Sequence, residues 1–162
     1  SIVESLYNRR SRILRMKNMQ GDSEPKLTEC FIKKTGWTAS SKNFKGLFGW
    51  KCFKSDGQIS ISGVSCILEV KKVMKNKEYG FWHGAIQSLI YSHLLSMSDN
   101  TKDIPILCII LDWGRNSGKD LSDVEKNFLN RFRDNKIFFV RLNYENKFFI
   151  EHNITSEYWE KL

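Results

Sequence analysis

Two acidic residues and one lysine stand at positions from which their side chains can meet at one point. Asp56 precedes a short run of alternating residues, and Glu69 and Lys71 follow a longer apolar run. The dipeptide Ser62-Gly63 between the two runs is typical of a tight hairpin turn. If the runs pair across this turn, Asp56 stands directly opposite Glu69. Lys71, two residues beyond Glu69, then lies on the same face of the hairpin.

The acid pair of Asp56 and Glu69 predicts a metal site. Two converging carboxylates repel each other unless a cation lies between them. Oxygen ligands without His or Cys favour Mg²⁺ or Mn²⁺. Such an ion polarises a phosphoryl oxygen and lowers the pKa of a bound water, and Lys71 can steady the attacking water or the developing charge. These are the groups that hydrolysis of a phosphodiester needs.

The spacing of these residues resembles the PD-(D/E)xK nuclease superfamily. Asp56 is followed by twelve residues and then by Glu69-Val70-Lys71, and Ser55 stands where the family often has Pro. The resemblance implies that Asp56 and Glu69 bind the metal together with the backbone carbonyl of Val70. It also implies that Lys71 assists the nucleophile.

The helix expected after the hairpin extends the resemblance. Gln87 and Tyr91 lie four residues apart on one helix face and resemble the QxxxY motif of exonuclease, RecB-like and type I restriction-subunit branches. Glu29 resembles the acid that these branches place in their first helix, and Glu24 is the alternative for that role. Glu29 lies opposite the apolar stripe of its helix, which favours solvent exposure. The resemblance thus adds Gln87, Tyr91 and Glu29 to the candidate catalytic residues.

Each of these motif residues also has a purely structural interpretation. Asp56 and Gly57 form an Asp-Gly turn signal, and a slip of one residue in the hairpin would send Asp56 to the other face. Glu69 and Lys71 could be exposed residues of an edge strand. Gln87 and Tyr91 could be ordinary surface and core residues of a helix.

The charge balance favours a polyanionic partner. The chain has 26 Lys and Arg residues against 18 Asp and Glu residues, which gives a net charge of +8. This excess points first to nucleic acid. The residues predicted to contact phosphates are Arg9, Arg10, Arg12, Arg15 and Lys72. A basic run of this kind is about as often a plain solvated helix face.

The length of 162 residues and the 41% hydrophobic content predict one domain with its own core, spanning residues 1–162. Residues 1–20 are expected to form a basic amphipathic helix. Further helices are expected at 25–36, 81–97 and 117–134 and from residue 156, and strands at 46–53, 58–61, 64–73, 104–111, 137–142 and 147–150. This order predicts an α/β fold with a short central mixed β-sheet flanked by helices. The resemblance implies the αβββαβ core of restriction-endonuclease-like proteins.

Other features bear on the location of the protein. The longest apolar runs, such as 104–111, are too short to span a bilayer, and the arginines in the first segment argue against a signal peptide. The cysteines form no CxxC pair and no zinc pattern, and they are expected to be reduced: Cys30, Cys52, Cys66 and Cys108. The expected location is therefore intracellular, either cytoplasmic or, in a eukaryote, nuclear.

The sequence predicts a nuclease that depends on Mg²⁺ or Mn²⁺, with DNA as the favoured substrate and RNA left open. The main alternative is an inactive module of the same fold that binds nucleic acid or a partner protein. A protein that lies on a membrane surface through its basic first helix is a weaker alternative, because the rest of the chain has the pattern of a compact domain. The oligomeric state stays open.

Overall fold

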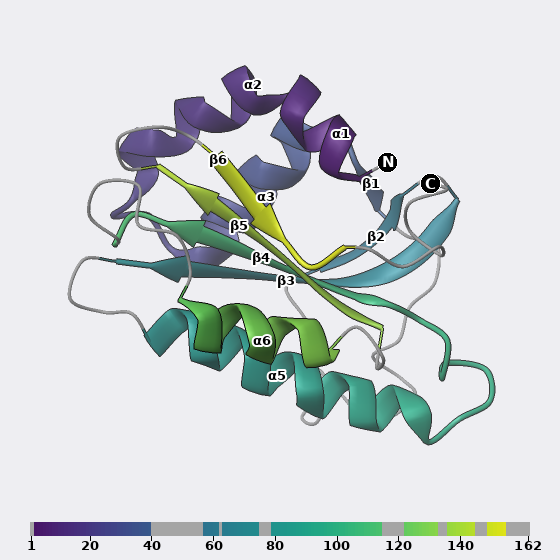
Figure 1. Ribbon diagram of the computed structural model, residues 1–162. Helices are drawn as coiled ribbons and strands as arrows, with labels where there is room; N and C mark the ends of the chain where they lie inside the picture. Colours follow the sequence, from purple (N-terminus) through teal and green to yellow (C-terminus); the bar gives the residue numbers. More distant parts are fainter. Residues whose placement is uncertain are drawn as a thin grey trace.

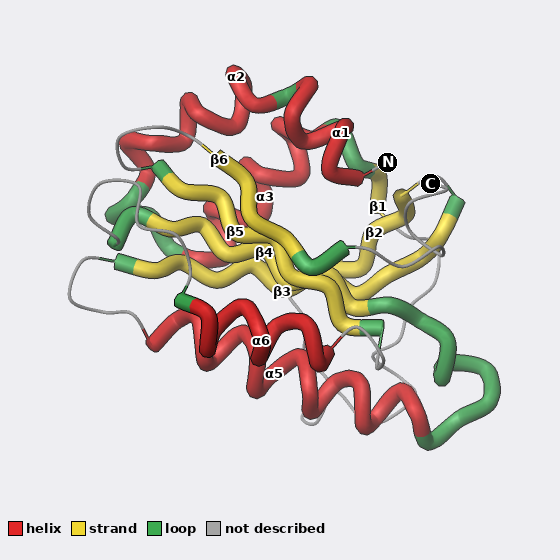
Figure 2. Tube along the Cα trace, viewed as in Figure 1, coloured by secondary structure: helices red, strands yellow, loops and turns green. Residues whose placement is uncertain are grey.

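The computed structural model describes residues 2–39, 57–61, 63–74, 79–114, 122–132, 136–144 and 149–154. In this part of the chain an open β-sheet lies between two layers of helices (Figure 1). Helices α1, α2 and α3 cover one face of the sheet, and α5 and α6 cover the other (Figure 2). The predicted α/β class, with a mixed sheet flanked by helices, is confirmed.

The sheet contains six described strands in the order β1-β2-β3-β4-β5-β6. Their bounds are Thr38–Ala39, Gly57–Ile61, Val64–Val73, Ile106–Asp112, Ile137–Asn143 and Phe149–His152. The neighbours β3, β4 and β5 are parallel, and the outer pairs are antiparallel. Strands β4 and β5 are buried along their whole length, as expected for parallel strands with helices on both faces. The expected strand at 46–53 and the expected helix from residue 156 lie outside the described residues.

The hairpin of β2 and β3 has the register that the sequence predicts. Gly57 pairs with Leu68 and Ile61 pairs with Val64, so the chain reverses between Ile61 and Val64. Gly63 has a φ of 82°, a left-handed conformation that glycine adopts without steric cost. A slip of one residue is therefore wrong for these pairs.

The single helix predicted over residues 1–20 is instead interrupted at Arg9. Helix α1 spans Ile2–Asn8, α2 spans Arg10–Leu14, and a 3₁₀ helix, η1, spans Arg15–Met19. Arg9 has φ −106° and ψ 11°, outside the α-helical region. Both parts still bury their apolar side, so the break redirects the segment without exposing the core.

The remaining helices have local sequence signals at their ends. Helix α3 (Glu24–Thr35) begins after Ser23, whose hydroxyl accepts a hydrogen bond from the Lys26 amide at 3.4 Å, and it ends at the left-handed Gly36. Helix α6 (Asp123–Arg131) begins with a capping box of Ser122 and Glu125. The helix expected at 25–36 agrees with α3, whereas the helix expected over 117–134 begins only at Asp123, because the capping box at Ser122 sets its start.

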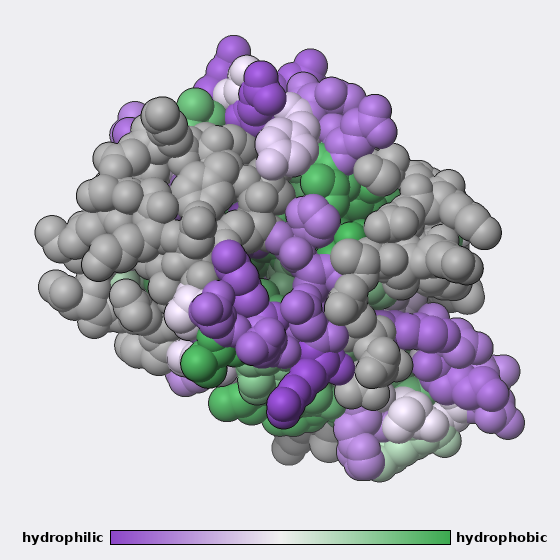
Figure 3. Space-filling view, in the orientation of Figure 1, coloured by the Kyte–Doolittle hydropathy of each residue, from purple (hydrophilic) through white to green (hydrophobic). Residues whose placement is uncertain are grey.

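Helix α5 (Tyr79–Ser96) connects β3 to β4 and packs across both strands. It is apolar on its outer side as well: Trp82, Ile86 and Ile90 are exposed. Figure 3 shows apolar surface along the lower edge of the molecule, where α5 lies in Figure 1. No described helix combines the length and apolar character needed to cross a membrane.

The sheet separates two hydrophobic clusters, and this separation decides where the candidate site lies. Leu68 and Val70 of β3 belong to the cluster under α1–α3, whereas Ile67 and Val73 belong to the cluster under α5 and α6. Side chains alternate between the faces of a strand. Glu69 and Lys71 therefore share the face that α5 covers.

Candidate active site

Glu69 and Lys71 form the centre of the candidate site on β3. Glu69 is only 1% exposed, and its Oε2 atom lies 3.9 Å from the Nζ atom of Lys71. The Lys71 side chain is 14% exposed, so it can still reach solvent or a ligand. A carboxylate this deeply buried is costly unless a positive charge compensates it. Lys71 supplies such a charge from two residues farther along the strand.

A second carboxylate reaches the same lysine from the first residue of α3. Glu24 Oε1 lies 3.9 Å from Lys71 Nζ, and Glu24 Oε2 accepts a hydrogen bond from the Lys72 amide at 3.3 Å. The cap at Ser23 begins the helix at this point and so determines where Glu24 stands. The structure thus brings two carboxylates from distant parts of the chain to one ammonium group.

Glu29 does not join this group. Its side chain is 72% exposed, and its carboxylate lies 3.4 Å from the ammonium of Lys33, one helical turn later. Leu27 and Phe31 are buried on the other side of α3, so Glu29 occupies the solvent face that its periodicity indicates. Glu24, rather than Glu29, is the acid of this helix that lies beside Lys71.

The predicted metal ligands are only partly within the described residues. Asp56 lies outside them, so its position opposite Glu69 stays a prediction, although the pairing of Gly57 with Leu68 matches the register on which it rests. Val70 is fully buried between Glu69 and Lys71, with its side chain in the cluster under α1–α3. Its side chain therefore lies on the opposite face of β3 from Glu69, and the role of its backbone carbonyl as a metal ligand stays a prediction.

The donor chemistry of the site fits a hard divalent cation. Glu24 and Glu69 offer carboxylate oxygens, which Mg²⁺ and Mn²⁺ prefer as ligands. Within the described residues, no group of three or more His, Cys, Asp or Glu side chains is placed to hold a metal. Asp56 is the acid that the sequence predicts to complete the set.

Helix α5 approaches the site most closely at Gly84. A Cβ atom at this position would lie 2.9 Å from Cys108 Sγ and 3.1 Å from Lys71 Cγ. Only glycine leaves enough room for this contact. The close approach of the helix therefore packs the stem of Lys71 against the sheet.

Gly84→Ala is expected to destabilise the fold by about 1–3 kcal/mol, because the methyl group overpacks the contact with Cys108 and Lys71. Urea unfolding followed by circular dichroism measures the change in the free energy of unfolding. Gly21→Ala is the matched control, because no atom lies within 4 Å of its added Cβ. Adding Cys108→Ala should restore part of the loss. Equal effects of the two glycine substitutions would contradict the proposed contact.

The two motif residues of α5 have different surroundings. Gln87 follows Gly84 by one turn and is half-buried, and its Oε1 atom is buried without a hydrogen-bond donor in the described part of the chain. A buried acceptor of this kind is commonly satisfied by a water or a ligand. Tyr91 is buried in the cluster that contains Ile67 and Ile106. The catalytic role of Tyr91 stays a prediction.

The basic residues predicted to contact phosphates also divide into two groups. Arg10, Arg12 and Arg15 are exposed on the α1–α2–η1 segment, and Arg9 is half-buried. Lys72 instead donates hydrogen bonds from its ammonium to the carbonyl oxygens of Gln20 at 3.1 Å and Asp22 at 2.8 Å. Lys72 thus ties β3 to the chain just before α3, and its charge is occupied within the fold.

Sequence reasoning missed a buried ion pair on the same face of the sheet. Arg141 Nε of β5 donates a hydrogen bond to Asp112 Oδ2 of β4 at 2.7 Å, and both residues are 1% exposed. Asp112 Oδ1 also accepts a hydrogen bond from the Gly114 amide at 2.8 Å. The sequence held one signal for this pair. Each of the two strands is apolar except for one charged residue, and these two residues, Asp112 and Arg141, have opposite charges.

Comparisons of this chain with family models, with curated proteins and with solved structures found no match. The site is therefore interpreted from its own residues and geometry.

Proposed function

We propose that this protein is a metal-dependent nuclease that hydrolyses phosphodiester bonds, with DNA as the favoured substrate. The observation that carries the proposal is the convergence of Glu24 and Glu69 on Lys71, each at 3.9 Å from its ammonium. Charged side chains are costly to bury. A structural role alone therefore rarely accounts for two carboxylates beside a lysine of a buried strand. The same group provides what phosphodiester hydrolysis needs.

Each residue of the site has a role that its position allows. Glu69 and Glu24, with the predicted Asp56, offer the oxygens that would hold Mg²⁺ or Mn²⁺. When bound, such an ion polarises a phosphoryl oxygen and makes a bound water more acidic. Lys71 is placed to hydrogen-bond the attacking water or to stabilise charge that develops on the phosphate. Gln87 adds a buried amide oxygen on the helix that covers this face.

The exposed arginines support a nucleic-acid substrate. Figure 3 shows strongly hydrophilic surface over α1 and α2, where Arg10 and Arg12 are exposed. Arginine binds phosphate oxygens through parallel hydrogen bonds, and such contacts hold a strand without reading its sequence. The proposed substrate contact is therefore mainly with the phosphate backbone.

An inactive module that binds nucleic acid or a partner protein is the second candidate function. The observation that favours it is the position of the Lys71 ammonium, which lies 3.9 Å from each carboxylate and compensates part of their charge without a metal. The described residues alone hold no cluster of three metal-binding side chains. The two functions differ in one result, which is cleavage when metal is added.

A cleavage assay separates these two functions. Single-stranded DNA, double-stranded DNA and RNA are incubated with the protein in Mg²⁺, in Mn²⁺ and in EDTA. The nuclease proposal requires cleavage with metal and none in EDTA. Binding of nucleic acid in EDTA without cleavage in either metal would support the inactive module.

Glu24→Gln is expected to slow cleavage by about 10–100-fold, less than a change at Glu69, because the Glu24 side chain is 36% exposed and stands at the rim of the site. The matched control is Glu29→Gln, which removes the same charge from the solvent face of the same helix and should leave the rate unchanged. Initial rates at saturating Mg²⁺ and the Mg²⁺ dependence of the rate provide the comparison. A loss of rate in the Glu29 variant alone would reverse the assignment of the two acids.

A further inference from the structure

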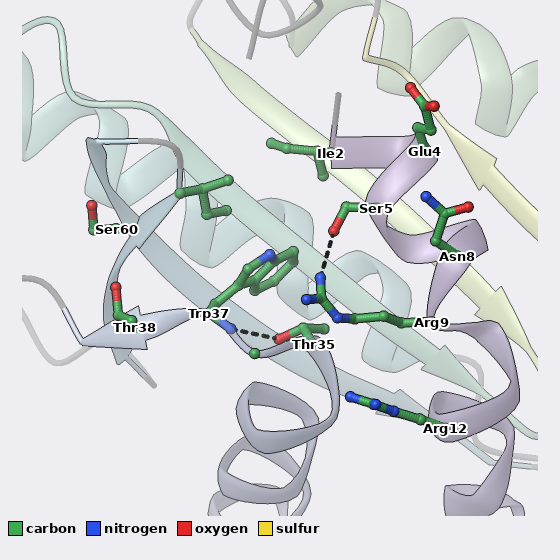
Figure 4. Close-up of a pocket in the computed structure, with 12 residues that line it drawn as sticks. Ile2, Glu4, Ser5, Asn8, Arg9, Arg12, Thr35, Trp37, Thr38 and Ser60 are labelled. Atoms are coloured by element: carbon green, nitrogen blue, oxygen red, sulfur yellow. Dashed lines mark hydrogen bonds between the residues drawn. The ribbon is translucent and has the colours of Figure 1, made fainter.

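A cavity of about 730 Å³ lies on the α1–α3 side of the sheet, whereas Glu69 and Lys71 lie on the α5 side. It is bordered by the α1–α2 segment, the end of α3 and strands β1 and β2 (Figure 4). Its volume lies within the range of about 300–1,000 Å³ that is typical of small-molecule sites. Glu24, Glu69 and Lys71 of the proposed cleavage site do not line it, whereas Arg12, which is proposed to contact the substrate backbone, does.

Two arginines give the cavity its positive charge. Arg9 and Arg12 extend from the α1–α2 segment toward α3, and the Glu4 carboxylate points away from both (Figure 4). Arg9 Nη1 donates a hydrogen bond to Ser5 Oγ at 3.0 Å, and Arg9 Nη2 lies close to Gly36 at the end of α3. These contacts hold Arg9 in place and also stabilise the end of α3, where the helix dipole is negative. Arg12 is exposed and is free of this structural task.

The rest of the lining includes polar residues and one aromatic ring. Thr35, Thr38 and Ser60 line the wall together with Trp37. The Thr35 hydroxyl donates a hydrogen bond to the Ile32 carbonyl at 3.0 Å and accepts one from the Trp37 amide at 3.4 Å, which ties the Trp37 backbone to the end of α3. The Trp37 ring contacts Phe31 edge to face, with centroids 5.6 Å apart and an angle of 74° between the planes, which orients the indole. Paired guanidinium groups suit a phosphate, and an oriented indole suits a planar base.

We propose that this cavity binds a nucleotide, with its phosphate at Arg9 and Arg12 and its base against Trp37. A free nucleotide and the terminal nucleotide of a strand carry the same chemistry and fit the same lining. The site is separate from the proposed cleavage site and does not depend on it.

The first test measures whether affinity depends on the phosphate. Isothermal titration calorimetry in EDTA compares AMP with adenosine, and a short 5′-phosphorylated single strand with the same strand lacking the phosphate. Tighter binding of either phosphorylated ligand supports the site. A difference in affinity between AMP and adenosine identifies a free nucleotide as the ligand. A difference between the two strands alone identifies a strand end. Equal affinities within both pairs, or no binding of any ligand, would overturn the proposal. EDTA removes metal-dependent cleavage, so the result is independent of the proposed nuclease activity.

The second test uses matched arginine variants. Arg12→Gln is expected to weaken binding of the phosphorylated ligand by about tenfold, the loss expected when a charged hydrogen-bond donor is removed. Arg131→Gln removes the same charge from an exposed position on α6, outside the cavity, and should have little effect. Thermal unfolding checks that both variants fold. Equal losses in the two variants would show general attraction by the net positive charge of the protein and would contradict a specific site.

Discussion

Glu69→Gln is expected to abolish metal-dependent cleavage while the protein stays folded. The substitution keeps the shape of the side chain and removes the charge with which Glu69 would bind a divalent ion. We expect the rate to fall by about a thousandfold or more, the scale seen when one central group of a catalytic site is removed. Lys71 keeps Glu24 as an ion-pair partner at 3.9 Å, so the variant does not leave a buried ammonium without a counter-charge.

Three measurements test this expectation together. Initial rates are measured in Mg²⁺ and in Mn²⁺, Mn²⁺ affinity is measured by calorimetry, and circular dichroism follows unfolding. Glu29→Gln is the control for the loss of one negative charge, because Glu29 is 72% exposed on the outer face of α3. Cleavage by the Glu69 variant at the wild-type rate, under matched metal, would refute the catalytic assignment. If the Glu69 variant loses both Mn²⁺ binding and cleavage, the result supports the assignment.

Asp112→Asn is expected to lower the free energy of unfolding by about 3–5 kcal/mol, the cost of leaving one member of a buried ion pair without its partner. Arg141 is fully buried, and its Nε atom donates to Asp112 Oδ2 at 2.7 Å. Asparagine can still accept the hydrogen bond from the Gly114 amide through Oδ1. The substitution therefore keeps the bond to Gly114 and removes both the charge and the acceptor that face Arg141. Urea unfolding of the variant and the wild type gives the difference.

Two controls distinguish the buried pair from a general effect of charge. The double variant Asp112→Asn with Arg141→Met removes both charges and should recover much of the lost stability. Asp103→Asn breaks the exposed pair of Asp103 and Lys136 and should change stability little, although the hydrogen bond from Lys136 lowers the pKa of Asp103. If the single Asp112 variant is as stable as the wild type, Arg141 does not need Asp112 as a buried counter-charge, and the expectation is wrong.

Local patterns in the sequence determined the strand pairing at the candidate site. Ser62-Gly63 marks the turn, and the alternation of apolar residues on both sides allows only one register that buries Ile59 and Ile61. The continuous apolar run at 104–111 predicts a fully buried central strand, because both faces of such a strand are covered. These features depend on neighbours in sequence, so they are visible without a structure.

Only the tertiary structure decided which charged groups meet. Helical periodicity indicates that Glu29 faces solvent, but it does not show that the start of α3 meets β3 and so places Glu24 beside Lys71. Likewise, the position of Lys72 gives no sign that its ammonium binds the carbonyl oxygens of Gln20 and Asp22.

Two more features were decided only by the tertiary structure. They are the buried pair of Asp112 and Arg141 and the break of the first helix at Arg9. Turn signals and apolar periodicity act over a few residues, whereas a contact between charged groups depends on how whole elements pack. Long polar side chains can reach several alternative partners, and the partner is selected by the distance and burial that packing imposes. The sequence by itself therefore determined the β2–β3 hairpin, its register and the fold class, and the packing of α3 and α5 against the sheet decided the composition of the site.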